Sequence, residues 1–189
     1  MKHNPFGFRL ALILCIFASL PCMQTSAFPI NFADFFEKLP HITLPFSLAK
    51  KGHVLTTDFK AGEKPYTYSF YISFNLRSCD PEQLHRVAIL LGLIDPNTGQ
   101  VFTQLDDRSI PIPLKLTVIR LDGEKETVVY NKEVSKTSSG GGTNSYLPRG
   151  IDSIKLEPAL YRVRLETLAA VPELADIPVN FEIGLPGKH

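Results

Sequence analysis

The chain has 189 residues, and its 20 basic and 19 acidic side chains give a formal net charge of +1. A balance this close to neutral excludes binding to nucleic acid or to an anionic membrane by bulk charge. The length fits one domain with a hydrophobic core of its own.

The first residues of the chain have the pattern of an export signal. Lys2 and Arg9 supply a positive start, residues 10–20 form an uncharged apolar run, and residues 25–27 are small, as a cleavage site requires. The apolar run is shorter than the ~20 residues that span a bilayer, and no later segment approaches that length without charge. We therefore predict a signal peptide at 1–27, export to the periplasm or out of the cell, and no transmembrane segment in the mature chain.

Cysteine usage agrees with an exported protein that has no internal disulfide. Cys15 and Cys22 lie inside the predicted signal peptide, so only Cys79 would remain. Such a domain must be stabilised by its hydrophobic core. In an alternative reading, Cys22 is a lipidated first residue that anchors the protein to a membrane, although Pro21 directly before it fits the usual lipobox poorly.

Phenylalanine is frequent directly after the predicted signal peptide. The stretch FADFFEKL (residues 32–39) is long enough for one or two turns of amphipathic helix before Pro40 ends it. We predict an N-terminal arm at 28–48 that docks its aromatic side chains on the core, followed by the main domain at 49–189. A helix that binds a membrane surface or a partner is the alternative for this arm.

The next segments alternate between apolar and polar residues. Val54 to Phe59 is a predicted strand, and Tyr66 to Leu76 is the clearest one, with aromatic or aliphatic side chains at every second position. Thr67, Ser69 and Ser73 fall on the opposite face. A period of two with a polar reverse face predicts a sheet with one buried face.

One helix and one hairpin follow. Asp80 and Pro81 are typical of a helix start, and Gly92 closes a segment with helical spacing of apolar residues. Further on, the stretch Ile110 to Val134 predicts a β-hairpin that turns at Asp122-Gly123.

The stretch LEPALYRVRLETL (residues 156–168) is the most regular of the chain. Tyr161, Val163 and Leu165 point one way, while Arg162 and Arg164 point the other, as in a half-exposed strand. Its start is similar to the tyrosine corner of Greek-key sandwiches, in which the hydroxyl group binds a nearby backbone group. PVNFEIG (residues 178–184) repeats the alternation.

Together these patterns predict an all-β fold. We expect an antiparallel β-sandwich of the immunoglobulin-like or Greek-key type with one short helix. An open barrel is the structural alternative.

Three stretches carry a family resemblance: IPIPLKL (residues 110–116), LEPALYRVRLETL and VPELADIPVNFEIG (residues 171–184). They resemble a family of exported proteobacterial proteins known only as a domain of unknown function. The likeness extends from about Phe46 to His189. It implies export and a β-rich fold, and it implies no catalytic residue.

The sequence lacks an assembled catalytic or metal-binding set. The histidines are scattered, no serine stands in a Gly-x-Ser-x-Gly elbow, and Asp106 and Asp107 are neighbours whose carboxylates diverge in an extended chain. Cys79 has His85 six residues away, across the predicted helix start. We therefore predict a non-enzymatic protein that has no cofactor and no metal site.

A loop rich in serine and glycine, residues 138–146, is the remaining candidate for a working surface, and a plain flexible loop is the simpler interpretation of it. Serine and asparagine adapt their hydrogen bonds, and tyrosine supplies contact area at a low entropic cost, so Ser139, Asn144 and Tyr146 are the candidate partner-binding residues. The leading hypothesis is a β-sandwich that binds another protein, as an inhibitor or as an immunity protein against a delivered toxin.

Two alternatives belong to other classes. A carbohydrate- or small-ligand-binding module would use exposed aromatic side chains, for which Tyr71 and Tyr130 are the candidates, although the chain has no tryptophan. A hydrolase would use Asp106, Asp107 or Cys79.

Overall fold

Strand pairing defines the architecture of this protein. The computed structural model describes residues 40–101, 109–139, 143 and 145–185. The predicted signal peptide, including Cys22, lies outside the described residues, as do Asp106, Asp107 and Asn144.

Two antiparallel sheets contain the strands. The first sheet has five strands in the order β1-β9-β3-β7-β6, and the second sheet has four in the order β2-β8-β4-β5. The bounds are β1 (Ile42–Phe46), β2 (Val54–Lys60), β3 (Tyr66–Asn75), β4 (Leu114–Asp122), β5 (Lys125–Val134), β6 (Ser138–Ser139), β7 (Tyr146–Leu156), β8 (Leu160–Thr167) and β9 (Val179–Gly184). Between strands lie the helix α1 (Pro81–Leu90) and the 3-10 helix η3 (Pro172–Leu174).

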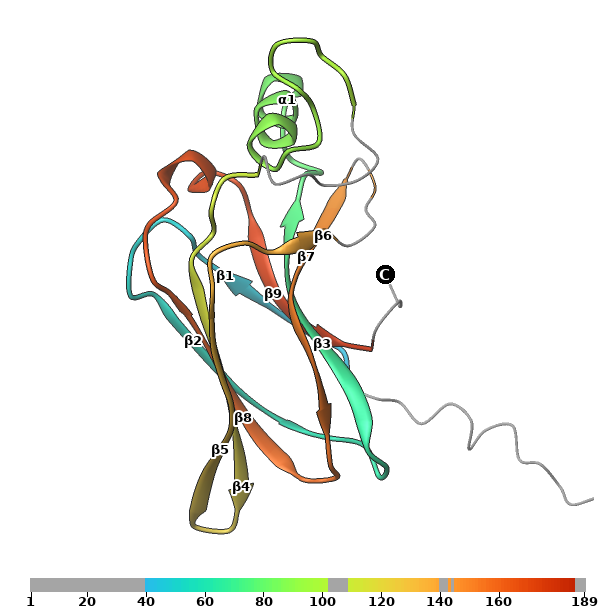
Figure 1. Ribbon diagram of the computed structural model, residues 1–189, viewed down its shortest axis with the longest axis vertical. Coiled ribbons are helices and arrows are strands. Elements are labelled where there is room, and N and C mark those ends of the chain that lie inside the picture. Colours follow the sequence, from blue (N-terminus) through green and yellow to red (C-terminus); the bar gives the residue numbers. More distant parts are fainter. Residues whose placement is uncertain (1–39, 102–108, 140–142, 144, 186–189) are drawn as a thin grey trace, which may run out of the picture. The chain divides into compact units, whose positions relative to one another are not determined.

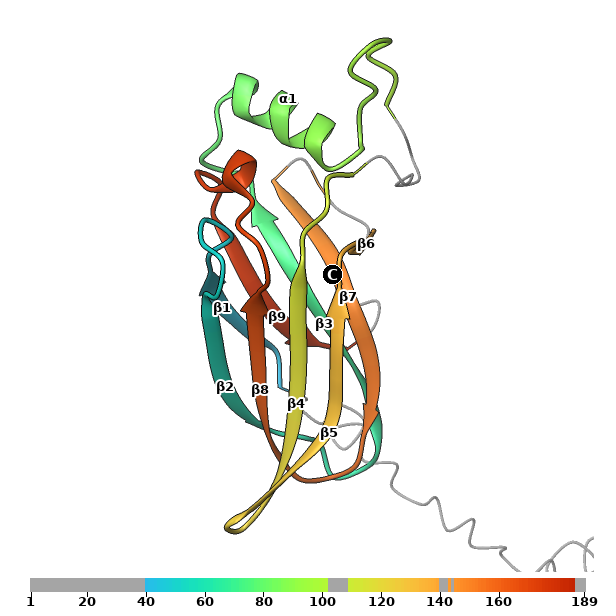
Figure 2. The same cartoon turned by 60° about the vertical axis from the view of Figure 1, so that its left-hand side comes forward.

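The two sheets face each other in a sandwich (Figures 1 and 2). Successive long strands mostly change sheets, so that β1, β3, β7 and β9 alternate with β2, β4 and β8, and only β4 and β5 form a local hairpin. With the short β6 set aside, this order is that of a jelly roll, which consists of two Greek keys. The predicted all-β sandwich with one short helix is therefore confirmed, and its connections are of the Greek-key type.

The core between the sheets consists of the residues that the alternating patterns placed inward. On β3 they are Tyr68, Phe70, Ile72 and Phe74, and the other central strands contribute Leu114, Leu116, Val118, Val163, Leu165, Phe181 and Ile183, all 0 % exposed. Because side chains alternate across a strand, every second residue in the buried part of these central strands enters this core. The predicted strands at 54–59, 66–76 and 178–184 are thus confirmed.

The predicted tyrosine corner is also present. The ring of Tyr161 is buried, and its hydroxyl group donates a hydrogen bond of 2.9 Å to the carbonyl oxygen of Glu157. Tyr161 also stacks on Phe59. This residue joins β7 to β8 and belongs to the folding of the chain.

The sandwich begins earlier than the sequence analysis placed it. Residues 42–46, which we assigned to the N-terminal arm, form β1 and pair with β9 from Ile42 opposite Ile183 to Phe46 opposite Val179. Phe46 and Leu48 are buried in the core. The ITLPF stretch alternates, with Ile42, Leu44 and Phe46 at every second position, but it is only five residues long and contains Pro45, which is unfavourable inside a sheet. Its pairing with β9 is what identifies it as a strand.

The strand connections differ strongly between the two ends of the sandwich. At one end the strands are joined by the short connections 61–65, 123–124 and 157–159. At the other end, called here the helical end, the connections are 47–53, 168–178 and the described parts of 76–113 and 135–145, and they include α1 and η3 (Figure 1). Strand pairing thus builds a rigid frame that presents its long segments at a single end.

Candidate binding site at the helical end

The helix α1 begins where the sequence predicted it. The Asp80 side chain accepts a hydrogen bond from the backbone N–H of Gln83, and the Gln83 side chain accepts one from the backbone N–H of Asp80. This capping box satisfies two backbone donors that a helix start otherwise leaves free. Val87 and Leu91 bury the inner side of the helix, so its outer side remains for other contacts.

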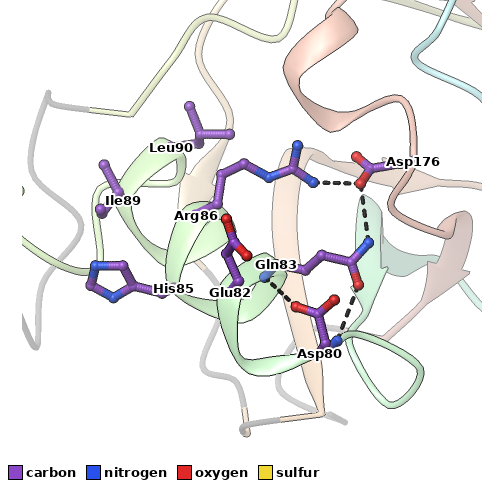
Figure 3. Close-up of a pocket in the computed structure, with 8 residues that line it drawn as sticks. All are labelled: Asp80, Glu82, Gln83, His85, Arg86, Ile89, Leu90 and Asp176. Atoms are coloured by element: carbon purple, nitrogen blue, oxygen red, sulfur yellow. Dashed lines mark hydrogen bonds and ion pairs between the residues drawn. The ribbon is translucent and has the colours of Figure 1, made fainter.

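The outer side of α1 borders a surface groove with a volume of about 510 Å³. Its lining consists of Asp80, Glu82, Gln83, His85, Arg86, Ile89 and Leu90 from the helix segment and Asp176 from the turn after η3 (Figure 3). Ile89 and Leu90 are half-buried, whereas Glu82 and His85 are exposed. The groove therefore combines an apolar floor with a charged rim.

Asp176 lies on the opposite wall of the groove and binds two side chains of α1. Arg86 forms an ion pair with its carboxylate, and the Gln83 side chain donates a second hydrogen bond of 3.1 Å to the same oxygen (Figure 3). The hydrogen bond from Arg86 is the main reason that the pKa of the Asp176 carboxyl lies below its usual range. Two residues of α1 are thus fixed to the β8–β9 connection.

A buried guanidinium group lies beneath the end of the helix. Arg149 on β7 is 2 % exposed, and its Nη2 atom donates a hydrogen bond of 3.0 Å to the carbonyl oxygen of Leu91. Among the described residues, its Nε and Nη1 atoms have no hydrogen-bond partner. Burial lowers the pKa of Arg149 to about 10. A cation at this position interacts favourably with the negative end of the helix dipole.

A second polar group lies on the outer face of the first sheet. Glu182 on β9 is 3 % exposed, and its carboxylate accepts hydrogen bonds from the hydroxyl groups of Ser73 and Tyr146, the latter at 3.1 Å. His41 lies 3.6 Å away at the rim, and the Tyr71 ring is buried beside it. We call these residues the Glu182 cluster.

The Glu182 cluster keeps its tyrosines protonated. Burial, followed by the charge of Glu182, raises the pKa of Tyr146 to about 12. The same two causes, in the same order, raise the pKa of Tyr71 beyond its usual range. The Tyr146 hydroxyl group thus stays protonated and donates a hydrogen bond to the Glu182 carboxylate.

The predicted partner-binding residues have different surroundings. Ser139 is the last residue of β6 and pairs with Arg149 in the first sheet. Tyr146 begins β7, is half-buried and directs its hydroxyl group to Glu182. Asn144 lies outside the described residues. The Tyr146 side chain thus contributes to the fold. Its position in a serine- and glycine-rich stretch did not indicate this.

The residues of the carbohydrate-binding alternative do not form an exposed aromatic platform. Tyr71 is on the outer face as expected, but it is 2 % exposed because the Glu182 cluster surrounds it. Tyr130 is half-buried and points toward the first sheet, where its hydroxyl group binds Asp152. The prediction that both tyrosines face solvent is wrong, because both hydroxyl groups face carboxylates of the same fold.

The residues of the hydrolase alternative can be placed only in part. Cys79 is half-buried, and burial is the main cause that raises its pKa, which disfavours the reactive thiolate. Asp106 and Asp107 lie outside the described residues. Within the part of the chain that the structure describes, no group of three or more His, Cys, Asp and Glu side chains is placed to hold a metal ion.

Sequence reasoning missed the groove and the Glu182 cluster. The alternation of PVNFEIG places Glu182 on the outer face of its strand, where a carboxylate is ordinarily solvated. Its proximity to Ser73 depends on the pairing of β3 with β9, for which the sequence has no local signal. The contact of Asp176 with α1 also has no local signal in the sequence, because the two segments are far apart in the chain.

No helix among the described residues is both long and apolar enough to cross a membrane. This finding concerns helices of those residues alone.

Comparison with known proteins identifies the family. A model described as "Domain of unknown function (DUF5625)" matches residues 43–185. The chain belongs to the DUF5625 family. The match begins within β1 and ends just after β9, so the DUF5625 domain corresponds to the sandwich described above.

A solved structure supports the fold of this DUF5625 domain. A crystal structure of a protein from Sulfurospirillum deleyianum aligns with a TM-score of 0.62 at 20 % sequence identity, covering 79 % of this chain and 99 % of that one. A structure of infectious bursal disease virus, Gx strain, aligns with a TM-score of 0.24 at 10 % identity, covering 79 % of this chain and 33 % of that one. No curated protein matches the chain.

Proposed function

We propose that this DUF5625 protein is an exported, non-enzymatic binding protein whose contact surface is the helical end of the sandwich. The observation that carries the proposal is the unequal distribution of strand connections. The long segments, with α1 and η3, gather at one end, and among the described residues the other end has only the short connections 61–65, 123–124 and 157–159. Rigid frames that present long segments in this way commonly use them for recognition.

The chemistry of the groove favours a protein as the partner. Interfaces between proteins have an apolar centre and a polar rim. Ile89 and Leu90 supply apolar surface, and Glu82, Arg86 and Asp176 supply the charged border. A partner that docks here would bury both, as an inhibited enzyme or a neutralised toxin would.

The pattern of residues 1–27 supports the location that we propose, which is the periplasm or the exterior of the cell. In a variant of this proposal, acylation of Cys22 anchors the exported protein to a membrane. Both locations leave the helical end free to meet a partner outside the cytoplasm.

Site-specific photo-crosslinking tests the proposal in the native host. A photo-reactive amino acid replaces either His85 in the groove or Glu124 in the short β4–β5 connection of the full chain. We expect illumination to yield a protein adduct from position 85 and none from position 124, because only the former borders the contact surface. Fractionation of the same cells checks whether the adduct lies outside the cytoplasm.

Three results would contradict the proposal: adducts only from position 124, equal adducts from both positions, or adducts only in the cytoplasm. The control at position 124 is suitable because Glu124 is exposed and far from α1 along the strands. Mass spectrometry of the adduct then identifies the partner.

A further inference from the structure

The geometry of the groove points to a more specific partner. We propose that it receives an amphipathic helix of the partner protein that carries a basic side chain seven positions from an apolar one. This inference rests on the proposed function and names the chemistry of the segment that binds.

The apolar part of the recognition comes from the floor of the groove. Ile89 and Leu90 are half-buried and border a volume of about 510 Å³, which is within the range for ligand-binding clefts. A volume of this size accepts one or two large apolar side chains. Removing those side chains from water is the main favourable contribution to docking.

The electrostatic part comes from a surplus of carboxylates around that floor. Arg86, the guanidinium group of the lining, is paired with Asp176, and one carboxylate oxygen of Asp80 caps α1. The exposed Glu82 carboxylate has no hydrogen bond or ion pair with the residues that the structure describes. The charge at this rim that still lacks a partner is therefore negative, and its complement is a lysine or arginine side chain.

The spacing of the two features sets the spacing in the partner. Glu82, Arg86 and Ile89 lie on one side of α1 at intervals of four and three residues. A rise of 1.5 Å per residue places Glu82 and Ile89 about 10 Å apart along the helix axis. In a partner helix that lies along the groove, two side chains seven positions apart are separated by the same distance and lie on one face. One of them, a basic side chain, can then meet Glu82 while the other, an apolar side chain, meets Ile89.

Titration of two synthetic peptides against the mature protein tests this inference by fluorescence polarisation. Both peptides are amphipathic helices with the same apolar residues, and they carry either lysine or glutamate seven positions from the central leucine. We expect the lysine peptide to bind at least 10-fold more tightly. The Glu82→Lys variant should lose or reverse this preference, and Ile89→Ser should weaken the lysine peptide at least 10-fold.

The Glu124→Lys variant is the matched control, because it makes the same charge change at the short-connection end. If it alters the preference as much as Glu82→Lys does, general charge attraction explains the binding and the inference is wrong. Equal binding of both peptides that depends on Ile89 would overturn the partner chemistry and leave the contact surface intact. Failure of both peptides, together with a crosslink from position 85, would likewise overturn the inference alone. Circular dichroism verifies that each variant is folded.

Discussion

Glu182 is a buried carboxylate whose lost hydration is replaced by hydrogen bonds from hydroxyl groups. Burying a charged group is costly unless hydrogen bonds replace the lost water. Ser73 on β3 and Tyr146 on β7 supply such bonds, and the exposed His41 approaches from the rim. The outer face of β3 is therefore dry around Ser73 and wetter at Ser69, although both residues are serines of one strand.

This difference predicts unequal effects of one substitution on the free energy of unfolding. Ser73→Ala removes a donor to a buried carboxylate and should cost about 2 kcal/mol. Ser69→Ala removes an exposed hydroxyl pair with Ser153 and should change stability by no more than about 0.5 kcal/mol. Urea unfolding of both variants measures the two values. Equal losses would show that the Glu182 cluster does not depend on the Ser73 hydroxyl group.

At the scale of elements, α1 is attached to the sandwich by several kinds of contact. Val87 and Leu91 are buried, the capping box closes the first turn, and Asp176 binds the side chains of Gln83 and Arg86. Arg149 reaches the last turn from β7. Because the groove lies along this helix, its shape depends on how firmly these contacts hold α1.

The capping box predicts a graded response at Asp80. Asp80→Ala removes the acceptor for the Gln83 N–H and should destabilise the protein by about 1 kcal/mol, whereas Asp80→Asn keeps an acceptor and should cost only a few tenths of that. Hydrogen exchange should become faster in α1 for the alanine variant and remain unchanged in β3. Urea unfolding and amide exchange of the two variants check this order. Similar stability of both variants would contradict a capping role for Asp80.

At the scale of the whole molecule, one side of the sandwich is tied across the two sheets. Tyr130 and Lys132 on β5 of the second sheet both bind the Asp152 carboxylate on β7 of the first, Lys132 at 2.8 Å. Burial acts to raise the pKa of Asp152, but the hydrogen bonds from Lys132 and Tyr130 outweigh it, so that the pKa lies below its usual range. This clasp joins β5, the edge strand of the second sheet, to β7 of the first sheet.

The lowered pKa of Asp152 predicts a dependence of stability on pH. In the unfolded chain an aspartate has a pKa of about 3.9. The clasp therefore stabilises the folded protein fully above that pH. This stabilisation disappears as the pH falls through the lower pKa that Asp152 has in the folded protein. Asp152→Asn should therefore be less stable than the wild type at pH 7 and nearly equal to it in strong acid. Urea unfolding at pH 7, 5 and 3 measures the difference. The Lys132→Met variant should show a weaker dependence of stability on pH, and the control variant Lys155→Met should keep the dependence of the wild type. A difference in stability between Asp152→Asn and the wild type that is the same at all three pH values would refute the clasp.

The parts of the fold that were predictable have causes close together in the chain. The strand at 66–76 follows from alternation, the start of α1 from Asp80 and Pro81, and the corner at Tyr161 from residues within five positions of its ring. Local backbone geometry decides each of these features. By contrast, β1 was assigned to an arm, because its alternation is short and contains Pro45, and the pairing that makes it a strand is with the distant β9.

The amino-acid sequence by itself determined the β-rich class, the single helix and most inward-facing residues, since these depend on residues a few positions apart. Only the tertiary structure decided the jelly-roll order, the groove between α1 and Asp176, and the burial of Tyr71, Ser73 and Glu182 in one cluster. Those features require contacts between strands that are remote in sequence, and the free energy of such contacts depends on which strands become neighbours.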